Sequence, residues 1–388
     1  MVAAFEKPIY VTRPLLPEKE KVALSIDEIW ETGQVTNNGQ QHKKLNLALE
    51  QYLESKNLSL FNNGTLALLL GLKALGLQGE VITTPFTFPA TVQALDWNQL
   101  TPVFCDIDPV TLNIDAEKIE DLITERTSAI LAVHVFGNPC DVNRIQEIAD
   151  RHKLKVIYDG AHAFGTRINN LPVSSFGDMT MFSFHATKLF NTIEGGALAF
   201  HDEALKKKLE LLKNFGLLNS EEVVLSGLNA KMNEIQAGVG LEVLKLVPDE
   251  RAKRHELKKA YEEHLADIPG IRIVTNLEHE FSSYQYFVIE IDEAEFGRSR
   301  DWVHKELGEF NVFPRKYFYP LCSDFEWYKE LESAQAGNLP VAHDRVERVL
   351  SLPFYGALEV QSVIKICEIL NGFHLDRTSN RQISEMRG

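Results

Sequence analysis

The segment Ser183-Phe-His-Ala-Thr-Lys188, with Glu194-Gly-Gly196 a short distance on, decides how this chain is interpreted. The residues from Asp178 to Ser183 are short, apolar and β-prone, which predicts a strand that ends at Ser183. His, Thr, Lys and Asn follow, as in a loop at the end of a strand. A lysine at the mouth of a buried strand loses hydration, which lowers its pKa and makes its amine able to form a Schiff base with a carbonyl. Most lysines are simply exposed on the surface, so whether Lys188 is a reactive lysine or an ordinary one depends on the rest of the chain.

Composition and charge narrow the class of protein. The chain has 388 residues, 44% of them hydrophobic, which is enough for two packed lobes. Its formal net charge of -15 argues against nucleic acid or an anionic membrane surface as a partner. The four cysteines lack the spacing of a metal site, the N-terminus lacks the pattern of a secretory signal, and no window is apolar enough to span a bilayer. We therefore expect a cytoplasmic protein without a metal.

Short β-prone runs alternate with helical patterns through the first two thirds of the chain. This alternation predicts right-handed crossovers and a mostly parallel sheet covered on both faces, which is an α/β architecture. Gly196–Phe200 follows the preceding strand too closely for a crossover helix, so we expect it to return antiparallel. The predicted strands are Glu80–Thr84, Pro102–Asp106, Ala129–Val135, Lys155–Asp159 and Met179–Ser183, and the predicted helices include Thr65–Leu75, Asp115–Leu122 and Val142–His152.

A smaller lobe is predicted after the long helical run that begins near Asn233. Asn233 and Gln236 have the spacing of a capping box, and Pro248 is expected to end the run before a second helix over Arg251–Leu265. Short strands and helices follow, among them a predicted strand over Tyr284–Ile291. We therefore predict a large domain at residues 1–248, N-terminal segment included, and a small C-terminal α+β domain at residues 249–388.

Asn62-Asn-Gly-Thr65 precedes a helix rich in Leu and Ala and is a candidate phosphate cradle. Gly64 lets the backbone approach a ligand closely, and the free N–H groups of the first helical turn suit a phosphate, together with the Thr65 hydroxyl. The same pattern also fits a simple helix cap without a ligand.

Two further segments follow predicted strands, where open α/β sheets bind ligands. The loop from Thr84 to Thr91 contains Phe86 and Phe88, which could present a flat face to a planar ring or could both belong to the core. Asp159 ends a buried strand, which is costly unless a cation meets the carboxylate, although it could also cap a helix.

These features together fit one cofactor. No pair of carboxylates, no Ser–His–Asp spacing and no HExxH motif is present, so hydrolytic chemistry has no support. A phosphate cradle, an aromatic face, an acid for a pyridinium nitrogen and a lysine for an aldehyde match pyridoxal phosphate held as a Schiff base. We therefore predict a pyridoxal phosphate enzyme.

The chain also resembles the DegT/StrS family of sugar-nucleotide aminotransferases. The resemblance implies the aspartate-aminotransferase-like architecture of pyridoxal enzymes of fold type I. The matching stretches are Asn63-Gly-Thr65, Thr87-Phe88 with Ala90-Thr91, Asp106-Ile-Asp-Pro109 with Asn113-Ile-Asp115, Gly137-Asn-Pro-Cys-Asp141, Asp159-Gly-Ala-His162, Ser183-Phe-His-Ala-Thr-Lys188 with Glu194-Gly-Gly, and Asn229-Ala-Lys-Met with Ile235-Gln-Ala237.

This resemblance implies a role for each matching residue. Lys188 would hold the cofactor and move protons, Asp159 would pair with the ring nitrogen, and His185 would lie close to the chemistry. Asn229 would reach the phosphate of a partner subunit, which makes the protein a homodimer with shared active sites. The other implied cofactor contacts are Phe88 and His162 at the ring and Gly64, Thr65 and Ser183 at the phosphate.

The prediction of the substrate, a keto sugar bound to a nucleotide, rests on the resemblance of two further segments, Pro8–Pro14 and Arg315–Leu321. They are similar to family members that transfer an amino group from a donor such as glutamate to C4 of a dTDP-4-keto-6-deoxyhexose. Arg315 and Lys316 suit a pyrophosphate, and Tyr317 or Tyr319 could bind a sugar hydroxyl or merely pack. Three alternatives stay open: amination at C3, a dehydratase of the same family, against which Lys188 argues, and a non-catalytic regulator that senses pyridoxal phosphate.

Overall fold

The computed structural model describes residues 2–274 and 282–385. A larger lobe is built around a seven-stranded sheet with the strand order β2-β10-β9-β6-β5-β3-β4. The neighbouring strands from β9 to β4 are all parallel, and β10 is antiparallel to both β2 and β9. The strands are β2 (Asn57–Phe61), β3 (Glu80–Thr83), β4 (Thr101–Phe104), β5 (Thr127–Val133), β6 (Lys155–Asp159), β9 (Met179–Ser183) and β10 (Gly196–Phe200).

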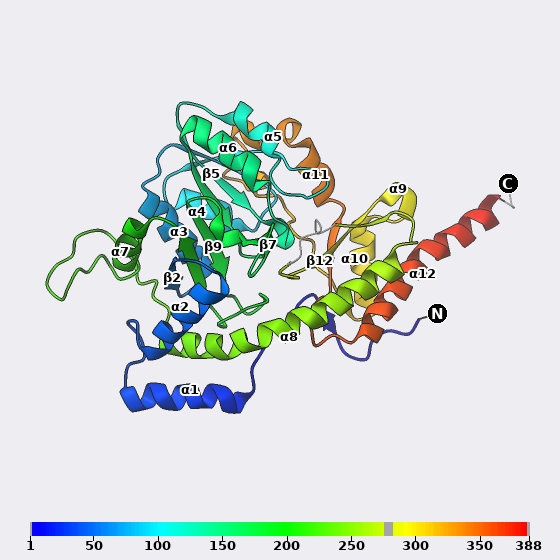
Figure 1. The fold of residues 1–388 in the computed structure, drawn as a ribbon. Coiled ribbons are helices and arrows are strands. Elements are labelled where there is room, and N and C mark those ends of the chain that lie inside the picture. Colours follow the sequence, from blue (N-terminus) through cyan, green and yellow to red (C-terminus); the bar gives the residue numbers. More distant parts are fainter. Residues whose placement is uncertain (1, 275–281, 386–388) are drawn as a thin grey trace.

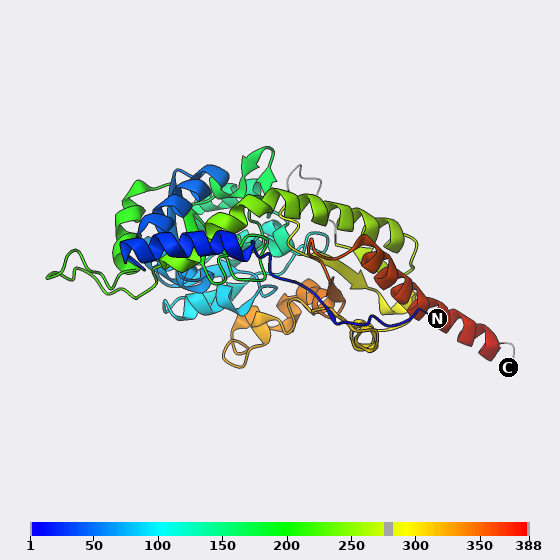
Figure 2. The same ribbon diagram turned by 90° about the horizontal axis from the view of Figure 1, so that it is seen from below.

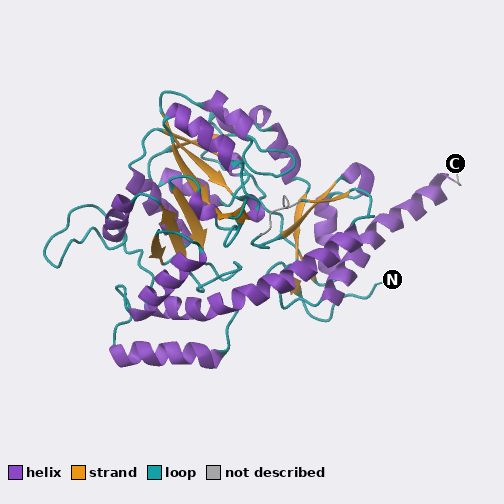
Figure 3. Cartoon of the chain, in the orientation of Figure 1, coloured by secondary structure: helices purple, strands orange, loops and turns teal. Residues whose placement is uncertain are grey.

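Helices cover both faces of this sheet, as Figures 1 and 3 show. Alternate strand residues enter separate cores: Ile130 packs in a cluster with residues of α2, α6 and α8, whereas Leu131 packs with residues of α3, α4 and α7. The helices of this lobe are α1 (Lys19–Thr32), α2 (Gln40–Tyr52), α3 (Gly64–Leu75), α4 (Pro89–Asp96), α5 (Ala116–Ile119), α6 (Val142–His152) and α7 (Glu203–Leu212), with short 3₁₀ turns at Glu120–Leu122, Val135–Gly137 and Val173–Ser175 and a small hairpin of β7 (Arg167–Ile168) and β8 (Leu171–Pro172).

A smaller α+β lobe follows, with a three-stranded antiparallel sheet in the order β11-β12-β14. The N-terminal strand β1 pairs in parallel with β13, so the start of the chain lies along this lobe (Figure 2). Its elements are β1 (Ile9–Tyr10), β11 (Ile271–Ile273), β12 (Phe287–Ile291), β13 (Val312–Phe313), β14 (Val349–Leu352), α9 (Glu293–Phe296), α10 (Arg300–Glu309), α11 (Pro340–Val346) and α12 (Val360–Glu385), with 3₁₀ turns at Cys322–Asp324, Glu332–Ala334 and Ala336–Asn338.

The long helix α8 corrects one prediction. Pro248 does not end the helical run: α8 extends without a break from Glu234 to Leu265, and the expected separate helix over Arg251–Leu265 is its second half. A proline inside a helix removes one hydrogen bond and costs about 3 kcal/mol. Buried side chains on both sides of Pro248, such as Val247 and Leu257, offset this cost by packing into the two lobes. The division into domains at residue 248 remains a prediction.

Other local predictions are confirmed, some with shifted ends. β6, β9 and α6 have the predicted bounds, β10 is antiparallel, and Asn233 and Gln236 form the capping box. The strand predicted over Tyr284–Ile291 begins only at Phe287, because Tyr284 has a φ of 48° and turns the chain. The helix predicted over Asp115–Leu122 is shorter, since Asp115 caps it and its last turn is 3₁₀.

Candidate active site

The carboxyl ends of two neighbouring parallel strands bring the main predicted residues together. Asp159 is the last residue of β6 and pairs with Met181 of β9, and Ser183 ends β9. Lys188 lies in the loop that follows, where its N–H donates to the His185 carbonyl at 2.8 Å. This edge of the sheet is where open α/β sheets bind ligands.

Asp159 is a buried carboxylate, 4% exposed. Oδ2 accepts a hydrogen bond from Thr91 Oγ1 at 2.7 Å, and Oδ1 accepts one from the Ala161 N–H at 3.0 Å. Thr91 in turn bonds Thr87 through their hydroxyls at 2.8 Å. Burial raises the pKa of Asp159, against the hydrogen bonds from Ala161 and Thr91 and the charge of Lys188. A cation placed beside this carboxylate would favour its charged form.

Lys188 is half-buried, and its ammonium lies 5.8 Å from the centre of the Tyr286 ring. Burial lowers the pKa of this amine to about 8, and the charges of Tyr317 and Asp159 oppose the shift. A substantial fraction of the amine is therefore neutral, and hence nucleophilic, near physiological pH.

An aromatic wall stands beside Lys188. The His162 ring stacks on Phe318 with 5.6 Å between centroids and meets the Tyr286 ring edge-on at 5.1 Å. Burial, helped by the charge of Lys188, lowers the pKa of His162 well below its usual value, so the ring is neutral. Within the described part of the chain, its Nδ1 atom is buried and has no hydrogen-bond partner, which leaves it able to bond a ligand.

The N-terminus of α3 closes tightly on the same strand ends. Asn63 caps the helix by accepting from the Leu66 N–H at 2.8 Å, and Thr65 is exposed at the first turn. A Cβ atom added at Gly64 would lie 3.1 Å from Ser183 Cβ, and one added at Gly196 would lie 2.6 Å from Gly64 N. The backbone of Gly64 leaves no room for a side chain at Gly196, and a side chain at Gly64 would crowd Ser183. This close approach brings the helix N-terminus and Ser183 into one cradle.

Three predicted residues stand further out. Phe88 is the N-cap residue of α4 and is 55% exposed, whereas Phe86 is buried in the core, so the two aromatics of that loop differ. His185 is exposed and bonds Thr187 through Nδ1 at 2.9 Å. Asn229 is exposed on the segment 214–232, here called the arm, which projects from the large lobe between α7 and α8 (Figure 1).

The predicted substrate loop adjoins the aromatic wall through Tyr317, whose ring centre lies 5.2 Å from that of Tyr286. Arg315 is exposed, and its charge lowers the pKa of both phenols against the larger effect of burial. Lys316 forms an ion pair with Asp301 at 2.7 Å. The ring of Tyr319, half exposed, lies over the Arg300 guanidinium at 5.4 Å and near the Lys316 ammonium at 5.8 Å.

Sequence reasoning missed three residues of this site. Thr91 was part of a matching stretch but carried no assigned role, although it bonds the Asp159 carboxylate. Tyr286 and Phe318 come from the small lobe and line the lysine and the histidine. Their contacts with Lys188 and His162 join segments far apart in the chain, so no local pattern places either ring at this site.

A mostly parallel sheet with a buried aspartate and a half-buried lysine at its ligand-binding edge, completed by a small α+β lobe, defines the aspartate-aminotransferase-like class of pyridoxal phosphate enzymes. Within that class, the chain belongs to the DegT/DnrJ/EryC1/StrS aminotransferase family, whose model matches residues 17–371. It is therefore an aminotransferase of a family that depends on pyridoxal phosphate.

Similar proteins match this chain over almost its whole length. A dTDP-4-amino-4,6-dideoxy-D-glucose transaminase of Shigella dysenteriae is 44% identical and covers 91% of this chain and 95% of its own length. One of Escherichia coli is 43% identical, with 95% and 99% covered. The crystal structure of DesI in the presence of its TDP-sugar product superposes with a TM-score of 0.92 at 35% identity, with 99% and 97% covered. Among the described residues no helix is both long and apolar enough to cross a membrane.

Proposed function

We propose that this protein transfers an amino group from glutamate to the C4 keto group of dTDP-4-keto-6-deoxyglucose, with pyridoxal phosphate held at Lys188. The product would be a 4-amino-4,6-dideoxy sugar nucleotide, made in the cytoplasm for a surface polysaccharide or glycoside. One observation carries the proposal: an amine with a pKa of about 8 stands beside a buried carboxylate at the ligand-binding edge of the sheet.

The residues at this edge fit the chemical groups of pyridoxal phosphate. Asp159 has a buried carboxylate that a cationic ring nitrogen would stabilise. Gly64, Thr65 and Ser183 form a compact cradle at a helix N-terminus, which suits a phosphate. The Nδ1 atom of His162, which has no partner among the described residues, can bond a substituent of the ring, and the exposed Phe88 would stack on the ring.

Pyridoxal phosphate supplies the electron sink that an amino-group transfer of this kind requires. The chain's own part is acid–base chemistry and positioning. The Lys188 amine, with a pKa of about 8, can take up and release a proton close to physiological pH. Asp159, held by Thr91 and Ala161, would keep a proton on the ring nitrogen. His185 would lie near the reacting groups, where its ring is fixed by Thr187.

The choice of C4 and of the thymidine nucleotide is supported by the two transaminases that are 44% and 43% identical. The relatives also include a GDP-perosamine synthase of Escherichia coli O157:H7 at 30% identity, so the nucleotide varies among similar proteins. In this chain, Arg315 and Lys316 would bind the pyrophosphate, and Tyr317 and Tyr319 would contact the sugar. Lys316 would then have to share or leave Asp301.

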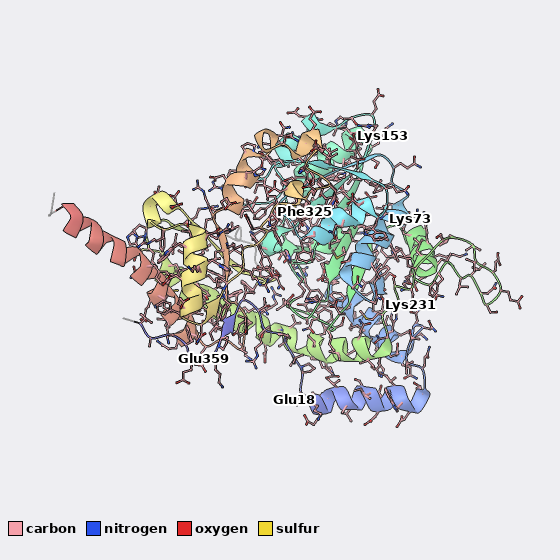
Figure 4. All side chains as sticks on the ribbon, turned by 180° about the vertical axis from the view of Figure 1, so that it is seen from behind. Glu18, Lys73, Lys153, Lys231, Phe325 and Glu359 are labelled. Atoms are coloured by element: carbon pink, nitrogen blue, oxygen red, sulfur yellow. The ribbon has the colours of Figure 1, made fainter. Side chains whose placement is uncertain are left out.

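The homodimer with shared sites is supported by the arm. Its exposed apolar side chains would be covered by a second subunit; they are Phe215, Leu218, Val223, Val224 and Leu228. Asn229 lies near its base, where its Oδ1 accepts from the Lys231 ammonium at 2.9 Å, and Figure 4 labels Lys231 at this end of the molecule. We infer that Asn229 reaches the phosphate site of the partner subunit.

The experiment that tests this function begins with purified protein and pyridoxal phosphate. Borohydride reduction followed by peptide mapping should label Lys188, and labelling at another lysine would contradict the cofactor assignment. The loaded protein is then incubated with glutamate and a panel of 3-keto and 4-keto sugar nucleotides carrying dTDP, UDP or GDP. We expect amination at C4 of dTDP-4-keto-6-deoxyglucose, identified by NMR. Preference for a 3-keto sugar would overturn the assignment of the substrate but not that of the aminotransferase. Cofactor binding without any turnover would favour a non-catalytic regulator.

A further inference from the structure

The side chain of Gln285 bonds the two peptide groups that flank Lys188. Its Oε1 atom accepts from the Leu189 N–H at 2.7 Å, and its Nε2 atom donates to the Thr187 carbonyl at 3.0 Å. Gln285 is 1% exposed and lies in the segment 282–286, which leads into the small lobe just before β12. One amide thus spans the backbone on both sides of the lysine.

The loop around Lys188 has no regular secondary structure to hold it. Between Ser183 and Gly196 the chain is neither strand nor helix. The Lys188 N–H is held within the loop by the His185 carbonyl. The carbonyl of that same peptide group, which belongs to Thr187, and the N–H of the next one, which belongs to Leu189, both bond Gln285. The Gln285 amide thus does for them what a neighbouring strand does in a sheet.

This contact requires an amide. One end of the side chain must accept a hydrogen bond and the other must donate one, and of the side chains that do not titrate only Gln and Asn offer both from one planar group. An ionised carboxylate would accept from Leu189 but would repel the Thr187 carbonyl. An apolar side chain of the same length would leave both peptide groups without a partner in a buried place.

Gln285 is itself held from behind by a buried ion pair. Arg254 of α8 donates to the carbonyls of Tyr284 at 3.1 Å and Gln285 at 3.5 Å, and its Nε atom bonds Glu250 Oε1 at 2.7 Å. Ser283 donates through its hydroxyl to the His162 carbonyl at 2.5 Å. The segment therefore reaches the Lys188 loop from a fixed base.

We propose that Gln285 is a positioning residue for Lys188, whose amide fixes the backbone on both sides of the lysine and so aims its amine. The proposal rests on the proposed function, in which that amine is the reactive group. A displacement of about 1 Å in a reacting group can lower a rate by about 10²-fold. Losing the amide should therefore lower turnover rather than substrate binding.

The test compares Gln285→Met, Gln285→Glu and the control Gln335→Met, each loaded with pyridoxal phosphate. Gln335 also donates from its amide to two backbone carbonyls, those of Lys329 and Leu331, but in another part of the small lobe. Each protein is measured for kcat per bound cofactor, for KM, and for the visible circular dichroism of the bound cofactor. That signal reports how the cofactor is oriented in its asymmetric site.

We expect Gln285→Met to lower kcat by about 10-fold to 10²-fold and to weaken the visible circular dichroism, with KM little changed. Gln335→Met should match the parent in all three. If Gln285→Met loses thermal stability but keeps the parent's kcat and circular dichroism, the amide serves only the fold and the proposal is overturned. If the parent itself binds no cofactor at Lys188, the proposed function fails instead.

Gln285→Glu keeps the proposal testable where the Met variant does not fold. A protonated carboxyl group can accept from Leu189 and donate to Thr187 as the amide does, and burial raises the pKa of such a group. Among the described residues, the titratable groups around position 285 include Lys188, Arg254 with its partner Glu250, and Tyr286 with its partner Tyr317, all of which the parent shares. The ratio of variant to parent kcat should therefore rise as the pH is lowered from about 9 to about 6. A ratio that does not change with pH would overturn the proposal.

Discussion

The loop of Lys188 and the loop from Arg315 to Tyr319 both contribute to the candidate site, but the chain holds them differently. Around Lys188, successive peptide groups bond His185 and Gln285, and the neighbouring Leu189 is fully buried. In the second loop Arg315 and Tyr319 are exposed. The chain thus holds the Lys188 loop by its own contacts, whereas the predicted substrate loop leaves the polar side chains of Arg315 and Tyr319 exposed. Substitutions in the first loop should lower activity equally with every sugar nucleotide. Substitutions in the second loop should lower activity by an amount that depends on the sugar.

The largest effect is expected at Lys188. Lys188→Ala should lower transamination by about 10⁴-fold or more with every keto sugar, because no other described amine of low pKa stands beside Asp159. Activity is followed by the glutamate-dependent formation of amino sugar. The loss should persist even where the variant still binds pyridoxal phosphate, and substantial remaining activity would remove Lys188 from the chemistry.

Asp159→Asn tests the buried carboxylate that lies beside the Lys188 loop. Removing one member of a buried charge pair costs about 2–5 kcal/mol, so kcat should fall by about 30-fold to about 10³-fold. The neutral amide keeps the shape and can still bond Thr91, so the fold should be retained. The matched control is Asp150→Asn, an exposed aspartate of α6 that bonds Gln146, which should behave as the parent does. Equal activity of the two variants would contradict the role of Asp159.

The pKa of Lys188 can be measured directly in cofactor-free protein. The neutral amine is the reactive form, so labelling with an amine reagent should rise through about pH 8 and then level off. An ordinary lysine continues to gain reactivity up to about pH 10.4. Because burial lowers this pKa in the folded state, the amine also makes the folded state more stable as the pH rises from about 8 to about 10.4. A midpoint near that of exposed lysines would contradict the burial of the amine.

A smaller and sugar-dependent effect is expected in the substrate loop. Tyr317→Phe removes one hydroxyl at the aromatic wall and should lower kcat/KM by about 3-fold to 10-fold, the value of a typical hydrogen bond. Tyr319→Phe, on the exposed side of the loop, should change it less. The assay compares sugar nucleotides that differ at one hydroxyl. If kcat/KM fell equally with all of these sugar nucleotides, Tyr317 would act like the residues around Lys188 and not as a contact to the sugar.

The sharing of sites between subunits is tested by complementation. Lys188→Ala protein is mixed in equal amount with Asn229→Ala protein, and subunits are allowed to exchange. Half of the dimers are then mixed and each mixed dimer has one intact site, so about a quarter of the parental activity should return. Exchange is verified by mass spectrometry of tagged subunits. If the mixture stays as inactive as the two separate variants although subunits have exchanged, Asn229 does not contribute to the partner's site.

Local signals in the sequence were sufficient for the two strands that end in Asp159 and Ser183. β-prone runs placed β6 and β9 with their terminal Asp159 and Ser183, and a capping box placed the start of α8. The sequence did not reveal the continuity of α8, because a proline normally ends a helix and only packing in both lobes keeps this one intact. Gln285 was also missed, since its partner Leu189 is 96 residues away and such a contact leaves no local pattern.

The unbroken helix α8 has a consequence for dissecting the protein. Its 32 residues supply buried side chains to the cores of both lobes, and its second half carries Arg254, which supports the segment behind Lys188. A gene cut after the codon for Pro248 would divide one helix between two polypeptides and expose apolar surface on each. We expect such fragments to aggregate when expressed apart and to regain solubility when coexpressed. A tag or reporter is therefore better inserted in a surface loop than at Pro248, inside α8.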